Sequence, residues 1–179
     1  DVLARTLAQR FTEAWGQQVV VENRPGGNNQ LAAEHVTKSA PDGHTLMIGP
    51  EVTFVVNPSL YGKLNYDPVN GFTPISGLVT INHALITHPS LPVGDMKELI
   101  DYVKKNPGLG LATSGVGSNQ HVLCEWFAKE AGIKVDHVPY RGAGQAINDL
   151  IAAHVKTALL GPTSMMPHWK AGTLTRLAQ

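Results

Sequence analysis

Two glycine-rich segments, each set between a short apolar run and a helical pattern, constrain the fold of this chain most. They run from Leu109 to His121 and from His137 to Gly144. An apolar run that breaks into small residues and then resumes at helical spacing predicts a strand, a loop and a helix. The first N–H groups of such a helix lack internal acceptors, and the helix dipole is positive there. Each corner therefore favours an anion without any charged side chain.

The second half of the chain alternates strands and helices at close spacing. Apolar runs predict strands near 84–87, from 109, at 135–138 and at 157–160, with helices between them. This pattern is typical of a doubly wound parallel α/β sheet. Because ligands of such sheets lie beyond the carboxyl ends of the strands, we expect a binding rim formed by the loops 49–53, 113–119, 139–144 and 161–164.

The first half shows a similar but looser alternation. Apolar residues at helical spacing predict a helix from the first residues to Gly16, and another with Leu31 and Val36 on one face. Short β-branched or apolar runs predict strands at 19–22 and 45–49, and residues 50–74 are rich in loop signals. The chain opens on a helix without an initiating Met and closes on what looks like a strand cut short, so we expect it to be a fragment of a longer protein that lacks both ends.

Composition excludes several classes of function. Fourteen basic residues balance fourteen acidic ones, so no net charge attracts nucleic acid or an anionic membrane. No apolar run approaches the ~20 residues that a membrane span requires, which excludes direct membrane insertion. A single cysteine, Cys124, rules out an internal disulfide. We expect no metal and no cofactor.

Enzymatic and nucleotide-binding alternatives fit the motifs poorly. The segments around Gly115 and Gly142 each lack the third glycine of a dinucleotide fingerprint and a suitably spaced acidic residue. His121 and Cys124 lie one helical turn apart, but two ligands do not make a zinc site. Ser118 lacks the flanking glycine of a nucleophile elbow. The alternative function is a serine- or histidine-dependent hydrolase or transferase that uses Ser118 or His121 in the same crevice. A purely structural alternative is that the glycines only permit tight turns.

A series of motifs along the whole chain resembles the receptors of tripartite tricarboxylate transporters, the Bug-type binding proteins. The motifs that carry the resemblance are Val21-Glu-Asn-Arg-Pro-Gly-Gly27, Ala40-Pro-Asp-Gly-His-Thr-Leu46, Leu64-Asn-Tyr-Asp-Pro-Val69, Lys105-Asn-Pro-Gly108, Thr113-Ser-Gly-Val-Gly-Ser118, His137-Val-Pro-Tyr-Arg-Gly142 and Lys170-Ala-Gly172. The resemblance implies a two-lobed α/β fold of the type II periplasmic binding protein class, incomplete in this chain. Its lobes would span residues 1–78 and 79–179.

The resemblance also implies a function. It indicates an exported, periplasmic receptor, not an enzyme, that captures a small mono-, di- or tricarboxylate between its lobes and delivers it to the permease subunits in the membrane. The ligand-binding residues expected on this basis are Thr53, Ser114, Gly115, Gly117, Ser118, Asn119, Tyr140 and Gly142. The loop from Gly49 to Thr53 departs from the family's small-residue pattern at Pro50-Glu51, and Glu51 would repel a carboxylate if it faced the ligand.

Overall fold

The computed structural model describes residues 1–178, which form two compact units. The first, unit 1, comprises Asp1–Ile75, and the second, unit 2, begins at Ser76. Regular secondary structure is distributed unevenly between them, since every strand of the described chain belongs to unit 2.

Unit 2 is built on a mixed five-stranded sheet in the order β3-β2-β4-β1-β5. Its strands are β1 (Ala84–Thr87), β2 (Leu109–Thr113), β3 (Val135–Pro139), β4 (Thr157–Leu160) and β5 (Thr175–Ala178). Strand β2 runs parallel to β3 and β4, whereas β1 lies antiparallel to both β4 and β5. The prediction of a parallel sheet is therefore wrong at β1. Strands β3 and β4 each follow a helical crossover from a parallel strand. Strand β1 instead follows the non-helical segment 76–83, so no crossover sets its direction.

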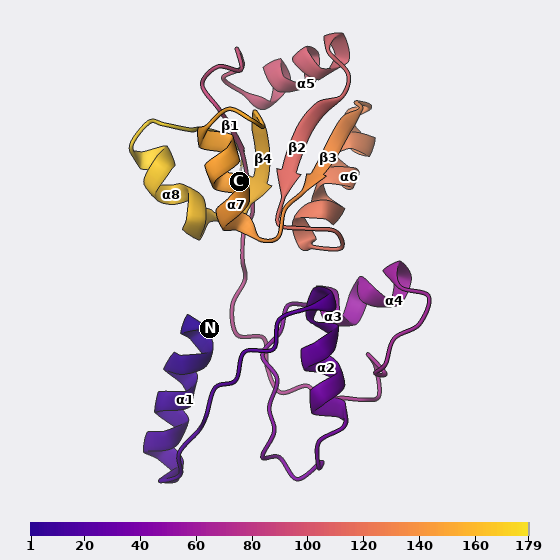
Figure 1. The fold of residues 1–179 in the computed structure, drawn as a ribbon, viewed down its shortest axis with the longest axis vertical. Helices are drawn as coiled ribbons and strands as arrows, with labels where there is room; N and C mark the ends of the chain where they lie inside the picture. Colours follow the sequence, from indigo (N-terminus) through magenta and orange to yellow (C-terminus); the bar gives the residue numbers. More distant parts are fainter. Residues whose placement is uncertain (179) are drawn as a thin grey trace. The chain divides into compact units, whose positions relative to one another are not determined.

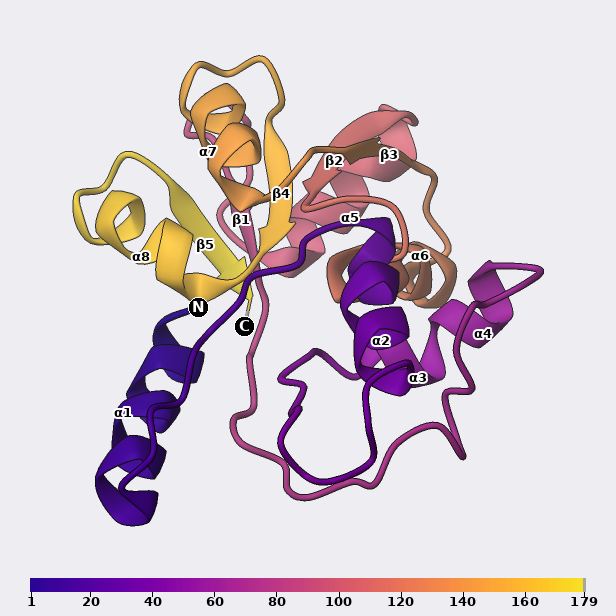
Figure 2. The same cartoon turned by 60° about the horizontal axis from the view of Figure 1, so that its bottom comes forward.

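Helices cover both faces of this sheet. They are α5 (Met96–Lys105), α6 (Asn119–Ala131), α7 (Ala143–Ile151) and α8 (Pro162–Lys170). Alternate strand residues contribute to two separate cores, because successive side chains of a strand point to opposite faces. Ile86 and Leu160 pack with residues of α7 and α8, whereas Leu85 and Leu159 pack with residues of α5 and α6. Figures 1 and 2 show these helix pairs on opposite sides of the sheet.

The helix boundaries follow local capping rules. Asp95 accepts a hydrogen bond from the Glu98 N–H at 2.8 Å, and the Glu98 carboxylate accepts one from the Gly94 N–H at 2.7 Å, so a capping box begins α5. Helix α6 ends at Gly132, whose φ of 60° is left-handed. Helix α8 was not predicted, since its internal Pro167 is a residue that normally argues against a helix.

Unit 1 contains helices joined by irregular segments. These are α1 (Val2–Trp15), the 3₁₀ turn η1 (Gly27–Asn29), α2 (Gln30–Thr37), α3 (Val52–Val55) and α4 (Asn57–Leu60). The predicted helices α1 and α2 are confirmed, and Gly16 ends α1 with a φ of 64°. The strands predicted at 19–22 and 45–49 are wrong. A strand needs a neighbouring strand to pair with, and among the described residues neither segment has one; Val20 and Ile48 are 79% and 47% exposed.

A buried polar network organises the core of unit 1. The fully buried Asn57 accepts a hydrogen bond from Asn28 Nδ2 at 2.7 Å and donates to the Asn28 carbonyl and the Tyr66 hydroxyl, both at 3.0 Å. The Tyr66 hydroxyl in turn donates to the Thr53 carbonyl at 2.6 Å. These bonds hold Asn28 in a left-handed conformation with a φ of 52° at the entrance to α2.

Candidate functional site

One edge of the unit 2 sheet gathers three helix N-termini. Because β2, β3 and β4 are parallel, their carboxyl ends meet at the same edge. The loop after each strand leads directly into α6, α7 or α8 (Figure 1). We call the three loops, residues 114–118, 140–142 and 161, the helix-start edge. The first N–H groups of these helices, which have no acceptor within the helix itself, and the positive ends of the helix dipoles therefore lie at this edge.

The first loop of this edge is shaped by its own hydrogen bonds. Ser118 is the N-cap of α6, and its Oγ accepts the His121 N–H at 3.2 Å while its hydroxyl donates to the Gly115 carbonyl at 2.7 Å. Gly115 and Gly117 have φ angles of 138° and 76°, in the region that side chains rarely adopt. The backbone N–H groups of both glycines donate hydrogen bonds within unit 2, that of Gly115 to Thr113 Oγ1 and that of Gly117 to His121 Nδ1. The loop is therefore a fixed turn, and its glycines are a conformational requirement.

Ser114 and Gln120 connect this loop to the start of β1. The Ser114 hydroxyl donates to Gln120 Oε1 at 2.8 Å, and Gln120 Nε2 lies 3.3 Å from His83 Nδ1. His83 directly precedes β1, and β1 begins beside the end of β4 because the two strands are antiparallel. The reversed strand β1 thus brings a histidine to the helix-start edge that a parallel sheet would not place there. Asn119, the remaining predicted residue of this loop, is the first residue of α6.

The second loop is joined to the first through the backbone. The Tyr140 N–H donates to the Thr113 carbonyl at 3.1 Å, and the Gly142 N–H donates to the Ser114 carbonyl at 3.3 Å. Gly142 is the N-cap residue of α7, with a φ of 108°. Six of the predicted residues therefore lie on two adjoining loops of unit 2, namely Ser114, Gly115, Gly117, Ser118, Tyr140 and Gly142, and Asn119 begins the helix that follows the first loop.

The Tyr140 side chain points into the protein body. Its hydroxyl donates to Asp149 Oδ2 on α7 at 2.8 Å, and its ring packs against the core on the α7 and α8 face. Desolvation, together with the hydrogen bond to the Asp149 carboxylate, raises the pKa of Tyr140 to about 12. The hydroxyl is thus committed to holding α7, and the part of Tyr140 that faces the first loop is its backbone.

Thr53, the predicted ligand residue of unit 1, is fully buried in the described structure. Its Oγ1 has no hydrogen-bond partner among the described residues, which is unusual for a buried hydroxyl. The Tyr66 hydroxyl bonds to its backbone carbonyl, so its position is fixed by the Asn57 network. Glu51, the residue expected to repel a carboxylate if it faced the ligand, directly precedes the short helix α3 and is exposed.

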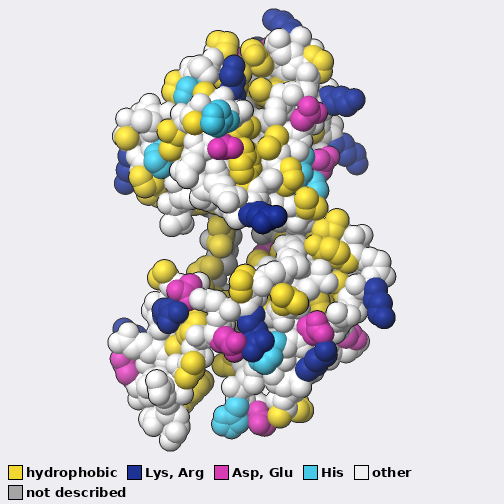
Figure 3. All heavy atoms as spheres, viewed as in Figure 1, with side chains coloured by type: hydrophobic (Ala, Val, Ile, Leu, Met, Phe, Trp, Pro, Cys, Tyr) yellow, Lys and Arg dark blue, Asp and Glu magenta, His cyan; other side chains and the backbone are white. Residues whose placement is uncertain are grey.

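Charge at the helix-start edge is sparse. The sequence segments 113–119, 139–144 and 161–164 contain no Asp or Glu, and their one cationic residue is Arg141. Elsewhere on the visible face of each unit, basic and acidic side chains are intermingled (Figure 3). An anion at this edge would therefore meet backbone dipoles and one guanidinium, with no carboxylate in these loops to repel it.

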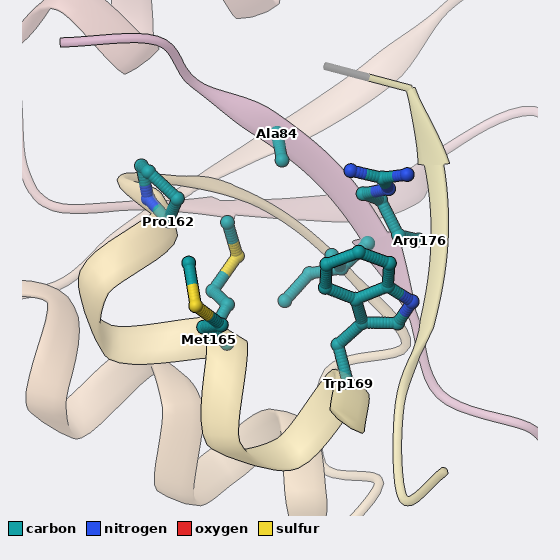
Figure 4. Close-up of a pocket in the computed structure, with 7 residues that line it drawn as sticks. Ala84, Pro162, Met165, Trp169 and Arg176 are labelled. Carbon is teal, nitrogen blue, oxygen red and sulfur yellow. The ribbon is translucent and has the colours of Figure 1, made fainter. Parts of the chain in front are cut away.

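Two cavities in unit 2 lie away from the predicted ligand residues. A cavity of about 40 Å³ between α8 and the sheet holds Arg176, whose guanidinium carbon lies 3.9 Å from the centre of the Trp169 ring (Figure 4). This volume suits a water molecule or two rather than an organic acid. The second, of about 220 Å³, lies on the α5 and α6 face and is lined by His83, Leu85, Met96, Leu111, Leu123, Phe127, Leu159 and Ala178. Neither includes a residue of the two joined loops.

The side-chain chemistry of the edge does not assemble a catalytic or metal centre. The Ser118 hydroxyl donates its proton to the Gly115 carbonyl, so it is not paired with an imidazole base. Among residues 1–178, no three His, Cys, Asp or Glu side chains are grouped so as to hold a metal ion. Cys124 is buried in the core, where desolvation and, to a lesser degree, Glu125 raise its pKa to about 11. No helix of the described residues is both long and apolar enough to cross a membrane.

Two histidines beside the first loop contact each other, and the sequence did not predict this contact. The rings of His121 on α6 and His137 on β3 are stacked, with centroids 3.9 Å apart and 10° between their planes. Each ring contacts a different residue of the first loop or its supporting strand. The residues are 16 positions apart in the sequence, and only the parallel pairing of β2 with β3 brings them together.

Comparisons with known proteins agree with this architecture. BugT of Bordetella pertussis is 32% identical over 180 residues, which cover 99% of this chain and 55% of BugT. The structure of Rpa4515 from R. palustris with adipate is 33% identical with a TM-score of 0.85, and MatC from Rhodopseudomonas palustris with bound malate is 29% identical with a TM-score of 0.82. The alignments cover 99% and 98% of this chain and 60% of each of those chains.

The structural matches confirm the expected α/β fold of periplasmic binding proteins. The chain spans about half the length of the curated relatives it matches, so it holds only part of that fold. The family named "Tripartite tricarboxylate transporter family receptor" matches residues 3–179, almost the entire sequence. The chain therefore belongs to the tripartite tricarboxylate transporter receptor family.

Proposed function

We propose that this chain is part of a periplasmic receptor that binds a small organic carboxylate and delivers it to the permease subunits of a tripartite transporter. Family membership supports this role, as do the carboxylates named with two relatives, adipate with Rpa4515 and malate with MatC. The observation that carries the proposal is the helix-start edge, where three helix N-termini meet in loops free of acidic side chains.

In this proposal N–H groups at the starts of α6 and α7 donate to the ligand carboxylate, with Ser114 and Asn119 beside them. The His121 N–H is not among them, because Ser118 Oγ accepts it. Gly115 and Gly117 let the backbone adopt the required turn, and Ser118 holds it closed. Tyr140 and Gly142 keep the second loop against the first. Thr53 stays a prediction, because its side chain is fully buried in unit 1. Arg141 adds attraction at longer range, since a single exposed cation contributes little in water.

Amide chemical shifts of the ¹⁵N-labelled chain would test this assignment. Titration with sodium adipate and with sodium malate should shift the amides of residues 114–120 and 142–144, while those of α5 remain in place. Adipamide has the same carbon skeleton without the charges and serves as the matched control. Equal shifts with adipamide, or shifts confined to α5 and the apolar cavity beside it, would contradict an anion site at the helix-start edge.

Turnover assays separate receptor from enzyme. A receptor releases its ligand unchanged, so incubation with a panel of simple esters and phosphoesters should yield no product. Hydrolysis that Ser118→Ala abolishes would instead support a serine-dependent activity.

A further inference from the structure

The stacked pair of His121 and His137 makes two hydrogen bonds that shape the first loop of the helix-start edge. The N–H of Gly117 donates to His121 Nδ1 at 3.1 Å. An imidazole nitrogen that accepts a hydrogen bond carries no proton, so in this arrangement His121 is neutral with its proton on Nε2. That nitrogen faces Glu125 Oε1 at 3.8 Å.

His137 holds the other end of the loop through Thr113. Its Nε2 lies 2.7 Å from Thr113 Oγ1, and Thr113 is fully buried. The Thr113 oxygen also accepts the Gly115 N–H at 3.3 Å. The hydroxyl proton therefore has a near acceptor in His137 Nε2 and only a distant one in the Gly115 carbonyl at 3.5 Å. This favours a neutral His137 with its proton on Nδ1.

Protonation of either ring opposes the observed hydrogen bonds. A proton on His121 Nδ1 would face the Gly117 N–H, which places donor against donor. A proton on His137 Nε2 would turn the Thr113 hydroxyl from this near acceptor to the distant Gly115 carbonyl at 3.5 Å. Two charged rings 3.9 Å apart would also repel each other. Burial, and secondly His121, lower the pKa of His137, while Glu125 opposes this shift. Strand β2 contributes no titratable side chain, so Glu125 is the charged group described in contact with the pair.

We propose that His121 and His137, as a neutral stacked pair, are positioning residues that hold the 113–117 turn in its anion-binding shape, so that their protonation releases the turn and weakens carboxylate binding. This inference rests on the proposed function of the helix-start edge. The alternative role predicts the opposite pH dependence. If the imidazoles attracted the ligand by their positive charge, acidification would strengthen the binding of an anion. The direction of the pH dependence therefore decides between positioning and charge attraction.

The experiment compares the chain with a variant in which the pair cannot titrate. His121→Asn places an amide oxygen near the position of Nδ1, and His137→Gln places one near Nε2, so the double variant retains both acceptors. His44→Asn, in an exposed turn of unit 1, is the matched control. Adipate affinity is measured for all three between pH 7.5 and pH 5.5, and the ratio to the double variant cancels the ionisation of adipate itself.

The affinity of the original chain and of His44→Asn should fall about three- to tenfold relative to the double variant across this range. Most of the loss is expected below pH 6.5, because the pKa of His137 is lowered from that ordinary value. A rise in relative affinity on acidification, or the same slope in all three proteins, would overturn the proposal.

A second measurement, without ligand, keeps the inference separate from the proposed function. The Gly117 amide shift should follow a histidine titration in the original chain and stay constant in the double variant. A constant Gly117 shift in both would overturn the positioning role. Failure of adipate to shift any amide of the helix-start edge at any pH would instead reject the carboxylate site, whatever Gly117 does.

Discussion

The N–H of Gly142 donates a hydrogen bond to the carbonyl of Ser114 across 3.3 Å, which joins the start of α7 to the loop before α6. A second backbone bond, from the Tyr140 N–H to the Thr113 carbonyl at 3.1 Å, extends the β2–β3 ladder up to this junction. The two glycine-rich segments that dominate the sequence are thus one continuous surface. A change in either segment should affect both helix N-termini.

Gly115→Ala should lower the free energy of unfolding by about 1–3 kcal/mol. The φ of Gly115 is 138°, and a Cβ there would lie 3.2 Å from the Tyr140 carbonyl oxygen, so strain and a close contact add together. Gly144→Ala is the matched control because its Cβ would meet nothing within 4 Å and its φ is not positive. That change should raise stability by about 0.4–1 kcal/mol. Urea unfolding of both variants checks the pair, and equal destabilisation would contradict this account.

Tyr140→Phe should cost about 1 kcal/mol of stability through the lost hydrogen bond to Asp149. Because the folded state raises the pKa of Tyr140, this contribution is present below pH 10 and is lost as the pH rises toward 12. Tyr102→Phe, on α5, is the control. Adipate affinity should be unchanged in the folded Tyr140→Phe variant. A lower affinity without any change in the unfolding midpoint would mean that the hydroxyl reaches the ligand.

The sequence predicted unit 2 well because its signals are local. Capping residues such as Asp95 and Ser118, the glycine at 132 and short apolar runs determine where helices and strands begin and end. The direction of β1 and the helix α8 were missed, since the first depends on long-range pairing and the second contains Pro167. In unit 1, the apolar runs at 19–22 and 45–49 have strand character, but strand formation also requires a neighbour that the described residues do not provide.

The candidate site was predicted at the level of loops and not of atoms. The glycine spacing predicted the two loops between Ser114 and Gly142 as candidate binding loops. It does not reveal that the Ser118 hydroxyl donates to the Gly115 carbonyl or that the Tyr140 hydroxyl donates to Asp149. The stacking of His121 on His137 has no local signal, because it arises from the packing of a helix against a strand.

Asn57→Ala should destabilise unit 1 by about 2–3 kcal/mol, since it removes three hydrogen bonds, two with Asn28 and one with the Tyr66 hydroxyl, from a fully buried position. Asn65→Ala removes an amide that bonds only at the surface, to Glu34, and should change stability by less than about 0.5 kcal/mol. Differential scanning calorimetry of both variants provides the comparison. Equal unfolding temperatures for the two would show that the Asn57 network contributes little.

The relative importance of Ser118 and Arg141 tests whether the carboxylate is held by backbone geometry or by a cation. Ser118→Ala removes the N-cap of α6 and should cost about 1 kcal/mol of stability, whereas Ser164→Ala, near the start of α8, should cost less because Ser164 is not an N-cap. Ser118→Leu also places a bulky side chain at the turn, where it displaces the N–H groups at the N-terminus of α6. Adipate binding should then be abolished.

Arg141→Ala removes the one cation of the three loops and leaves their backbone unchanged, so adipate affinity should fall only about two- to fivefold, as expected for an exposed charge contributing less than about 1 kcal/mol. Calorimetric titration of Ser118→Leu and Arg141→Ala at low and high salt measures both effects, and the Arg141 contribution should shrink as salt rises. A larger loss for Arg141→Ala than for Ser118→Leu would assign the carboxylate to the guanidinium, and the helix N-termini would then only shape the loops around it.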